Sequence, residues 1–110
     1  MKKIFWHDGT VDAIRLNGPT RRKHASLELD VSLYPTDVSP ERVPFTLVCG
    51  GLHLFDINGD AAVLRDNSGA GNIVDGAIVS SGEASRATIE LTGGMLVLKA
   101  NKIQLKRRSS

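Results

Sequence analysis

Strict alternation of apolar and polar side chains over residues 25–33 constrains the fold of this 110-residue chain more than any other feature. In the segment ASLELDVSL, every odd-numbered residue from Ala25 to Leu33 is apolar and every even-numbered residue is polar. Successive side chains of a strand point to opposite faces of a sheet. The pattern therefore predicts an antiparallel strand with one buried face and one face in water. The segment RATIEL, residues 86–91, repeats it.

Similar reasoning predicts strands along most of the chain, at residues 3–7, 10–17, 45–49, 52–57, 61–65, 73–79 and 96–105. Turn signals separate them at Asn17-Gly18, Asn58-Gly59, Ser81-Gly82 and Gly93-Gly94. Asn58-Gly59 is the strongest hairpin signal, because both residues tolerate positive φ. The alternation changes parity at Asn101, which requires a β-bulge or a tight turn there.

The number of strands and turns predicts a single all-β domain over residues 1–110. Ser80 and Glu83 have the spacing of a capping box, so a short helix is the alternative for the residues that follow. Residues 84–91 fit alternation better than a helical face. We expect an antiparallel β-sandwich or barrel of about eight or nine short strands, at most one short helix, and a basic C-terminal tail at about residues 106–110.

Composition excludes several protein classes. The apolar run Ile4–Trp6 is far shorter than the core of a signal peptide, and no apolar run approaches the roughly 18 residues of a membrane span. The single cysteine, Cys49, rules out an intrachain disulfide and a zinc site built from cysteines, and it is expected to be buried as a small hydrophobe. These features predict a cytoplasmic protein without a membrane segment.

The net charge of +2 is unevenly distributed. Residues 4–101 contain eight basic and twelve acidic side chains, so the excess of positive charge lies at the two ends. A nucleic-acid footprint should instead cover one face of a domain. Weak nucleic-acid binding through Arg21–His24 and the basic C-terminus Lys106–Arg108 therefore stays an alternative hypothesis.

The glycine-rich stretch Asp66–Gly76 lacks the lysine of a phosphate-binding loop, and a turn before a strand explains it better. Asp56, Asn58 and Asp60 occupy positions 1, 3 and 5 of a calcium-binding loop, but Ala61 and Asn67 stand where glycine and glutamate are required. This set is a weak metal candidate, and we expect no other cofactor.

The segment FWHDGTVD holds the richest chemistry, with Trp6, His7, Asp8 and Asp12 as candidate binding residues. A His–Asp pair can act as an oriented base. Adjacent strand residues point to opposite faces, however, so His7 and Asp8 can cooperate only if the strand ends there. The chain also lacks a Gly-x-Ser-x-Gly elbow and a His-Glu-x-x-His motif. We therefore expect packing or a binding surface, and no enzymatic activity.

Trp6-His7-Asp8, followed by a strand and then a long alternating strand, resembles small all-β proteins of polymorphic-toxin immunity type. The resemblance covers about the first third of the chain and implies a protein that occludes the surface of a partner. The sequence thus predicts a non-enzymatic domain that binds another protein or itself, with strand edges as a route to a homodimer. The alternatives are a weak nucleic-acid binder and a β domain that binds a small ligand or Ca²⁺.

Overall fold

The computed structural model describes residues 5–18, 25–36, 38–60, 73–82 and 84–108. These residues form six strands and no helix: β1 (Phe5–Asn17), β2 (Ser26–Tyr34), β3 (Val43–Gly59), β4 (Ile73–Ser81), β5 (Ala84–Leu91) and β6 (Gly94–Arg107). The all-β prediction is confirmed.

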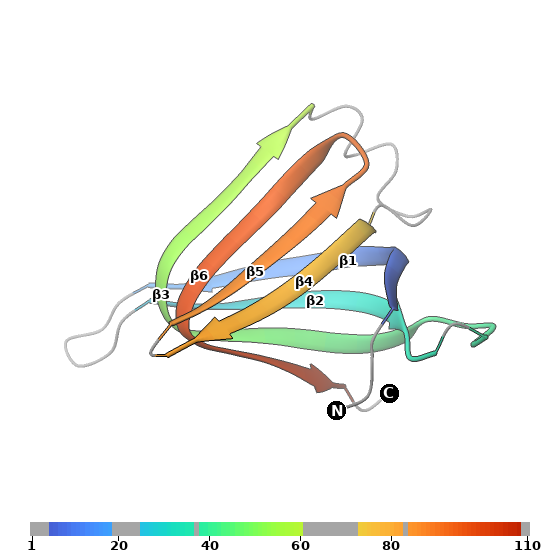
Figure 1. Cartoon of the computed structure of the whole chain (residues 1–110), viewed down its shortest axis with the longest axis horizontal. Coiled ribbons are helices and arrows are strands. Elements are labelled where there is room, and N and C mark those ends of the chain that lie inside the picture. Colours follow the sequence, from blue (N-terminus) through green and yellow to red (C-terminus); the bar gives the residue numbers. More distant parts are fainter. Residues whose placement is uncertain (1–4, 19–24, 37, 61–72, 83, 109–110) are drawn as a thin grey trace.

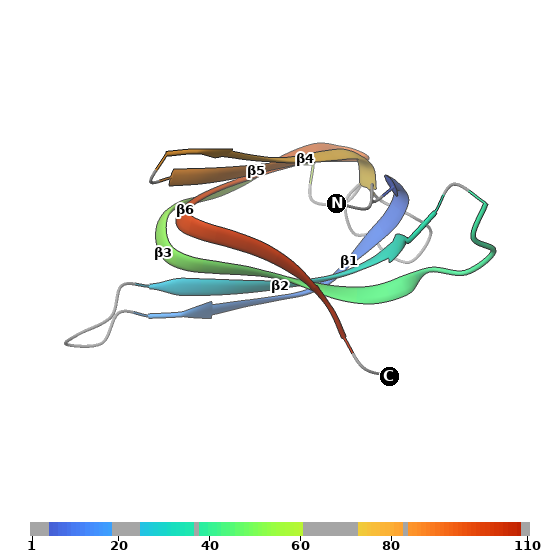
Figure 2. The same cartoon turned by 60° about the horizontal axis from the view of Figure 1, so that its bottom comes forward.

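All six strands belong to one open antiparallel sheet with the order β1-β2-β3-β6-β5-β4. The long strands β3 and β6 bend together, so that β4 and β5 lie across from β1 and β2 (Figures 1 and 2). The sheet edges β1 and β4 also contact each other. The predicted arrangement of eight or nine strands in a sandwich or barrel is not confirmed.

Long continuous strands explain part of the difference in strand number. The separate strands expected at 45–49 and 52–57 are one strand, β3, and residues 96–105 lie within β6. Alternation does change where predicted: Ala100 and Ile103 are both buried although they are three residues apart. The sheet bends at this point, where Gly51 of β3 has a φ of 66° and lies against Asn101. The strand expected at 61–65 falls outside the described residues.

The core lies between the two halves of the folded sheet. The alternating residues of β2 that were predicted to face inward, Leu27, Leu29, Val31 and Leu33, are all 0% exposed. They belong to one cluster with buried residues of β5 and β6, among them Ile89, Leu96 and Leu98. Residues 84–91 form β5 and not the alternative helix. Period-two patterning therefore identified both walls of the core correctly.

The predicted turns had different outcomes. Ser81-Gly82 and Gly93-Gly94 lie at the β4–β5 and β5–β6 hairpins, as predicted. The hairpin predicted at Asn58-Gly59 is wrong, because both residues continue β3 and pair with β6. A side chain at position 59 would place its Cβ 2.2 Å from the carbonyl oxygen of Gly93. Glycine is therefore needed here for close approach of two backbones.

The C-terminal basic residues also differ from expectation. Lys106 and Arg107, predicted to begin a tail, are the last residues of β6 and pair with Thr46 and Phe45. The backbone N–H of Arg108 donates to the carbonyl of Pro44 at 2.9 Å. Pairing with β3 therefore continues through Arg108.

Candidate functional site

An open pocket lies where β1 begins and β2 ends. It has a volume of about 340 Å³ and is lined by Phe5, His7, Asp8, Tyr34, Thr36, Ser39 and Pro40, a set that we call the His7 pocket. Its walls combine two aromatic rings and a proline with an imidazole, a carboxylate and hydroxyl groups. Two of the four residues predicted from the sequence, His7 and Asp8, are in it.

An unusual backbone conformation brings His7 and Asp8 together. Asp8 has a φ of 65°, the only positive φ among the described residues other than glycine. The register between β1 and β2 shifts between Phe5 and Thr10, so alternation is interrupted although the strand continues. The expectation that the two side chains could meet only at a strand end is therefore wrong. His7 Nε2 lies 3.6 Å from Asp8 Oδ2.

Two neighbours hold this conformation. Arg42 Nε donates a hydrogen bond to the carbonyl oxygen of Asp8 at 2.8 Å. The next residue, Gly9, is buried, and a Cβ there would lie 2.6 Å from a methyl group of Leu33. A non-glycine residue with this φ is in a sparsely populated conformation, which persists only because its surroundings fix it, and such conformations cluster at functional sites.

His7 also connects the two edges of the sheet. Its Nδ1 lies 2.9 Å from the carbonyl oxygen of Val74 in β4. A carbonyl can only accept a hydrogen bond, so Nδ1 carries the proton. In the neutral ring, Nε2 is then an acceptor beside the Asp8 carboxylate. The side chains of His7 and Asp8 are 73% and 62% exposed, so both can reach a ligand.

Tyr34 and Arg42 complete the site, and neither was identified from the sequence. The guanidinium carbon of Arg42 lies 5.7 Å from the centre of the Tyr34 ring, which is a cation–π distance. Arg42 thus contacts both the ring that lines the pocket and the backbone of Asp8. Asp8, Tyr34 and Arg42 are separated by 26 and 8 positions along the sequence, and no recognisable spacing relates them.

Trp6, the third predicted residue, packs away from the pocket against β4. A Cβ added to Gly76 would lie 2.4 Å from the Trp6 ring. Gly76 therefore provides space for the tryptophan, which is why the end of the glycine-rich stretch matters to the fold. Gly71 and the preceding residues of that stretch are outside the described part.

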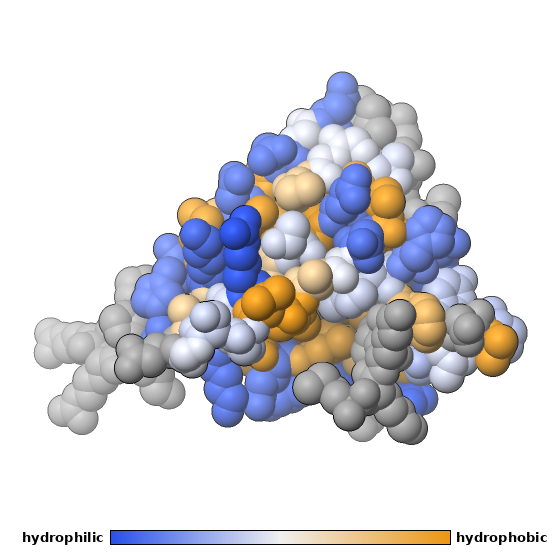
Figure 3. All heavy atoms as spheres, viewed as in Figure 1, coloured by the Kyte–Doolittle hydropathy of each residue, from blue (hydrophilic) through white to orange (hydrophobic). Residues whose placement is uncertain are grey.

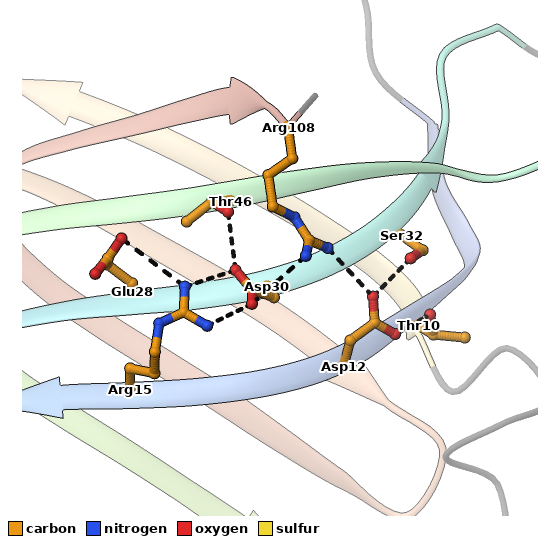
Figure 4. A network of polar contacts seen from close by, with 8 residues as sticks. All are labelled: Thr10, Asp12, Arg15, Glu28, Asp30, Ser32, Thr46 and Arg108. Carbon is orange, nitrogen blue, oxygen red and sulfur yellow. Dashed lines mark hydrogen bonds and ion pairs between the residues drawn. The ribbon is translucent and has the colours of Figure 1, made fainter. Parts of the chain in front are cut away.

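Asp12, the fourth predicted residue, belongs to a separate polar network (Figure 4). Its two carboxylate oxygens accept hydrogen bonds from Thr10 Oγ1 at 2.7 Å and Ser32 Oγ at 2.6 Å. Arg108 Nη2 lies 3.7 Å from it. Asp12 therefore helps to hold β1 to β2 and to the end of the chain that follows β6.

Asp30 is the centre of this network, although the alternating pattern assigned it to the water-facing side of β2. Asp30 is only 7% exposed. Both carboxylate oxygens accept hydrogen bonds from Arg15, one of them at 2.8 Å, and Oδ1 also accepts from Thr46 Oγ1 at 2.8 Å (Figure 4). Arg108 Nη1 lies 3.6 Å away.

The hydrogen bonds from Arg15 are the largest influence on Asp30 and hold the pKa of its carboxyl far below the ordinary range. Burial acts in the opposite direction, and Thr46 and Arg108 favour the charged form. Aspartate is depleted in strands. Glu28 has the same place in the alternating pattern of β2, but its side chain is 40% exposed, so the sequence alone did not distinguish Asp30 as the buried carboxylate.

The residues of the weak metal candidate lie at the end of β3 and directly after it. Asp56 and Asn58 are exposed residues of the extended strand β3, and Asn58 Nδ2 donates to Asp56 Oδ2 at 3.4 Å. Within the described ranges, no group of three or more His, Cys, Asp or Glu side chains is placed to hold a metal.

Cys49 is buried, as predicted, and burial raises the pKa of its thiol to about 11. The basic group Arg21–His24 lies outside the described residues. Over the part of the chain that the structure covers, there is no helix long and apolar enough to cross a membrane.

Comparisons with known proteins give no match: no protein-family model, no curated protein and no solved structure is similar to the chain. A fold alone does not define a function, so the function is inferred from the residues of the site.

Proposed function

We propose that this protein is a non-enzymatic binding domain that contacts another protein through the rim of the His7 pocket. The observation that carries the proposal is the stacked Tyr34–Arg42 pair beside an open, partly aromatic hollow. Tyrosine and arginine are enriched among the residues that dominate binding energy at protein interfaces.

The chemistry of the pocket supports a side chain from a partner as its occupant. Phe5, Tyr34 and Pro40 offer apolar contact, and the Asp8 carboxylate beside the His7 imidazole offers an exposed acceptor. A ligand group that is both apolar and a hydrogen-bond donor would satisfy both. The volume of about 340 Å³ is at the small end of ligand pockets, which suits one or two side chains.

An immunity-type role is one form of this proposal, because it also requires occlusion of a partner surface without chemistry. Self-association is a separate mode of binding, because it involves a different surface, the β4 edge. The nucleic-acid alternative is less well supported, since Arg108 already faces the carboxylates of Asp12 and Asp30. The small-ligand alternative was a pocket inside a barrel, and the six described strands form one open sheet.

The proposal is tested by quantitative affinity capture from lysate of the source cells, after nuclease treatment, with wild type and variants side by side. Asp8→Asn removes the carboxylate, and asparagine tolerates positive φ, so the backbone is retained. Tyr34→Ala removes the aromatic wall. Glu90→Gln is the control, because Glu90 is an exposed carboxylate on β5.

We expect a stoichiometric protein partner that wild type and Glu90→Gln retain equally and that both pocket variants lose at least tenfold, which corresponds to about 1.4 kcal/mol. Unfolding curves establish that each variant is folded. A partner retained equally by all four proteins would refute the pocket as the binding surface. Nucleic acid that is released by salt, with no protein, would favour the basic residues instead.

A further inference from the structure

The first half of the β4 edge is occupied by contacts from the protein's own side chains. His7 donates to the carbonyl of Val74, and Trp6 packs against Gly76. The carboxylate of Asp75 accepts a hydrogen bond from the N–H of Gly76 at 2.8 Å. These contacts use backbone groups and space that an added strand would need, so they protect this half of the edge from pairing.

The second half of β4 differs. Ser81 pairs with Ala84 at the end of the β4–β5 hairpin, where a two-residue connection makes the flanking residues a hydrogen-bonded pair. Backbone groups alternate in direction along a strand, so Ala77 and Val79 also point toward β5. Ile78 and Ser80 then direct their N–H and C=O groups away from β5. The Gly76 N–H, which Asp75 binds, fits the same alternation.

β4 is the last strand of the sheet, and no described strand pairs with it on that side. The segment Ala77–Ser81 contains no charged residue and no proline, the two devices that commonly protect an edge. Val79 is 61% exposed, the most exposed large hydrophobic residue in β3–β6. Figure 3, which faces β4, shows hydrophobic residues in the middle of the view.

We propose that two copies of this chain associate through antiparallel pairing of their β4 strands, centred on Val79. This register places Ile78 opposite the partner's Ser80, and Ser80 opposite the partner's Ile78. All four outward-facing backbone groups of each copy then find partners in four hydrogen bonds. Val79 meets the partner's Val79 on the exposed face, and an apolar β-branched pair of this kind is favourable.

Self-pairing fits this edge better than the open edge at the end of β6. Pairing of the β6 segment Lys102–Arg107 with itself would bring three cationic residues of each copy together. Like charges opposite one another destabilise a strand pair. At the β4 edge, by contrast, a two-fold axis through Val79 brings no charged residues of the edge strands together.

The inference goes beyond the proposed function and does not depend on the His7 pocket. Sedimentation velocity over a range of concentrations should show a reversible change from 11.8 kDa to twice that mass. Val79→Lys places two cations at the centre of the interface and should raise the midpoint concentration roughly tenfold or more. Leu54→Lys, at a 40% exposed position of β3, is the matched control and should leave the midpoint unchanged.

Amide hydrogen exchange locates the interface independently. The N–H groups of Ile78 and Ser80 should exchange more slowly as the concentration rises. Those of Ala77 and Val79, which already bond to β5, serve as controls within the same strand. A monomer at every concentration, a dimer that Leu54→Lys disrupts, or exchange at Ile78 and Ser80 that is independent of concentration would overturn the proposal. Partner capture by the His7 pocket would be unaffected by any of these results.

Discussion

Replacing Asp30 with asparagine tests whether the polar network on the outer face of β1–β3 stabilises the fold. The Asp30 side chain is 9% exposed and accepts hydrogen bonds from Arg15 and Thr46. An asparagine amide has one acceptor oxygen and no charge, so the paired contact with the guanidinium is lost. Hydrogen bonds to charged groups contribute about 1.5–3 kcal/mol each. The side chains of Arg15 and Arg108 are 45% and 37% exposed, so water can hydrate them when the carboxylate is removed, and this reduces the loss.

We therefore expect Asp30→Asn to lower the free energy of unfolding by about 2 kcal/mol at neutral pH, and to lower Tm by about 8 °C. The value lies between that of an exposed ion pair and that of a fully buried one, because the carboxylate is buried while its cationic partners are half-exposed.

The stabilisation of the fold by Asp30 should decrease as the pH is lowered. The hydrogen bonds from Arg15 keep the pKa of folded Asp30 far below that of the unfolded chain, which is about 3.9. Below that pH the unfolded chain binds a proton that the folded chain does not, so the stabilisation by Asp30 falls as the pH is lowered. Between about pH 6 and about pH 3, the free energy of unfolding of wild type should fall by about 1 kcal/mol more than that of Asp30→Asn. The difference in stability between the two proteins should therefore become smaller in acid.

Urea unfolding followed by the fluorescence of Trp6, the single tryptophan, measures both effects. Glu28→Gln is the control: Glu28 is on the same strand, 3.8 Å from Arg15 and 40% exposed. We expect it to change the free energy of unfolding by less than about 0.5 kcal/mol. If Asp30→Asn has an equally small effect at neutral pH, or if the difference from wild type does not narrow in acid, the network does not stabilise the fold as argued.

One further substitution and one labelling reaction test the packing of the core and of β4. Gly76→Ala should lower the free energy of unfolding by about 1–3 kcal/mol and change the Trp6 emission, because the new Cβ would lie 2.4 Å from that ring. Gly50→Ala is the control and should do neither, because its Cβ would have nothing within 4 Å. Equal unfolding curves for the two variants would contradict the contact. The thiol of Cys49, fully buried with its pKa raised to about 11, should react with a thiol reagent only at the rate of unfolding, and rapid labelling of the native protein would contradict its burial.

The core could be predicted from the sequence because it follows from local periodicity. Alternation between Ala25 and Leu33 is a property of adjacent residues, and burial of one face requires only that a second layer exists. The parity change at Asn101 was equally local, since Ala100 and Ile103 cannot both face inward in a regular strand. The bend of the sheet occurs there.

Features that depend on the approach of distant segments could not be predicted in this way. Asn58-Gly59 has the composition of a turn, yet Gly59 is glycine because the Gly93 backbone comes close to it across the β3–β6 ladder. Arg15 and Asp30 are 15 residues apart, and their contact depends on the β1–β2 register. Both cases required knowledge of which strands pair, and at which residues.

The His7 pocket shows why the candidate site could be predicted only in part. The imidazole performs two tasks: Nδ1 binds the carbonyl of Val74 and thereby joins β1 to β4, while Nε2 faces Asp8 at the pocket. Substitution of His7 would remove a contact between sheet edges together with a pocket group, so a loss of binding could not be assigned to either. Among the described residues, the Asp8 side chain makes no such contact with another strand, and Asp8→Asn changes charge while keeping the backbone conformation that Arg42 supports. The carboxylate is therefore the group whose removal separates binding from folding at this site.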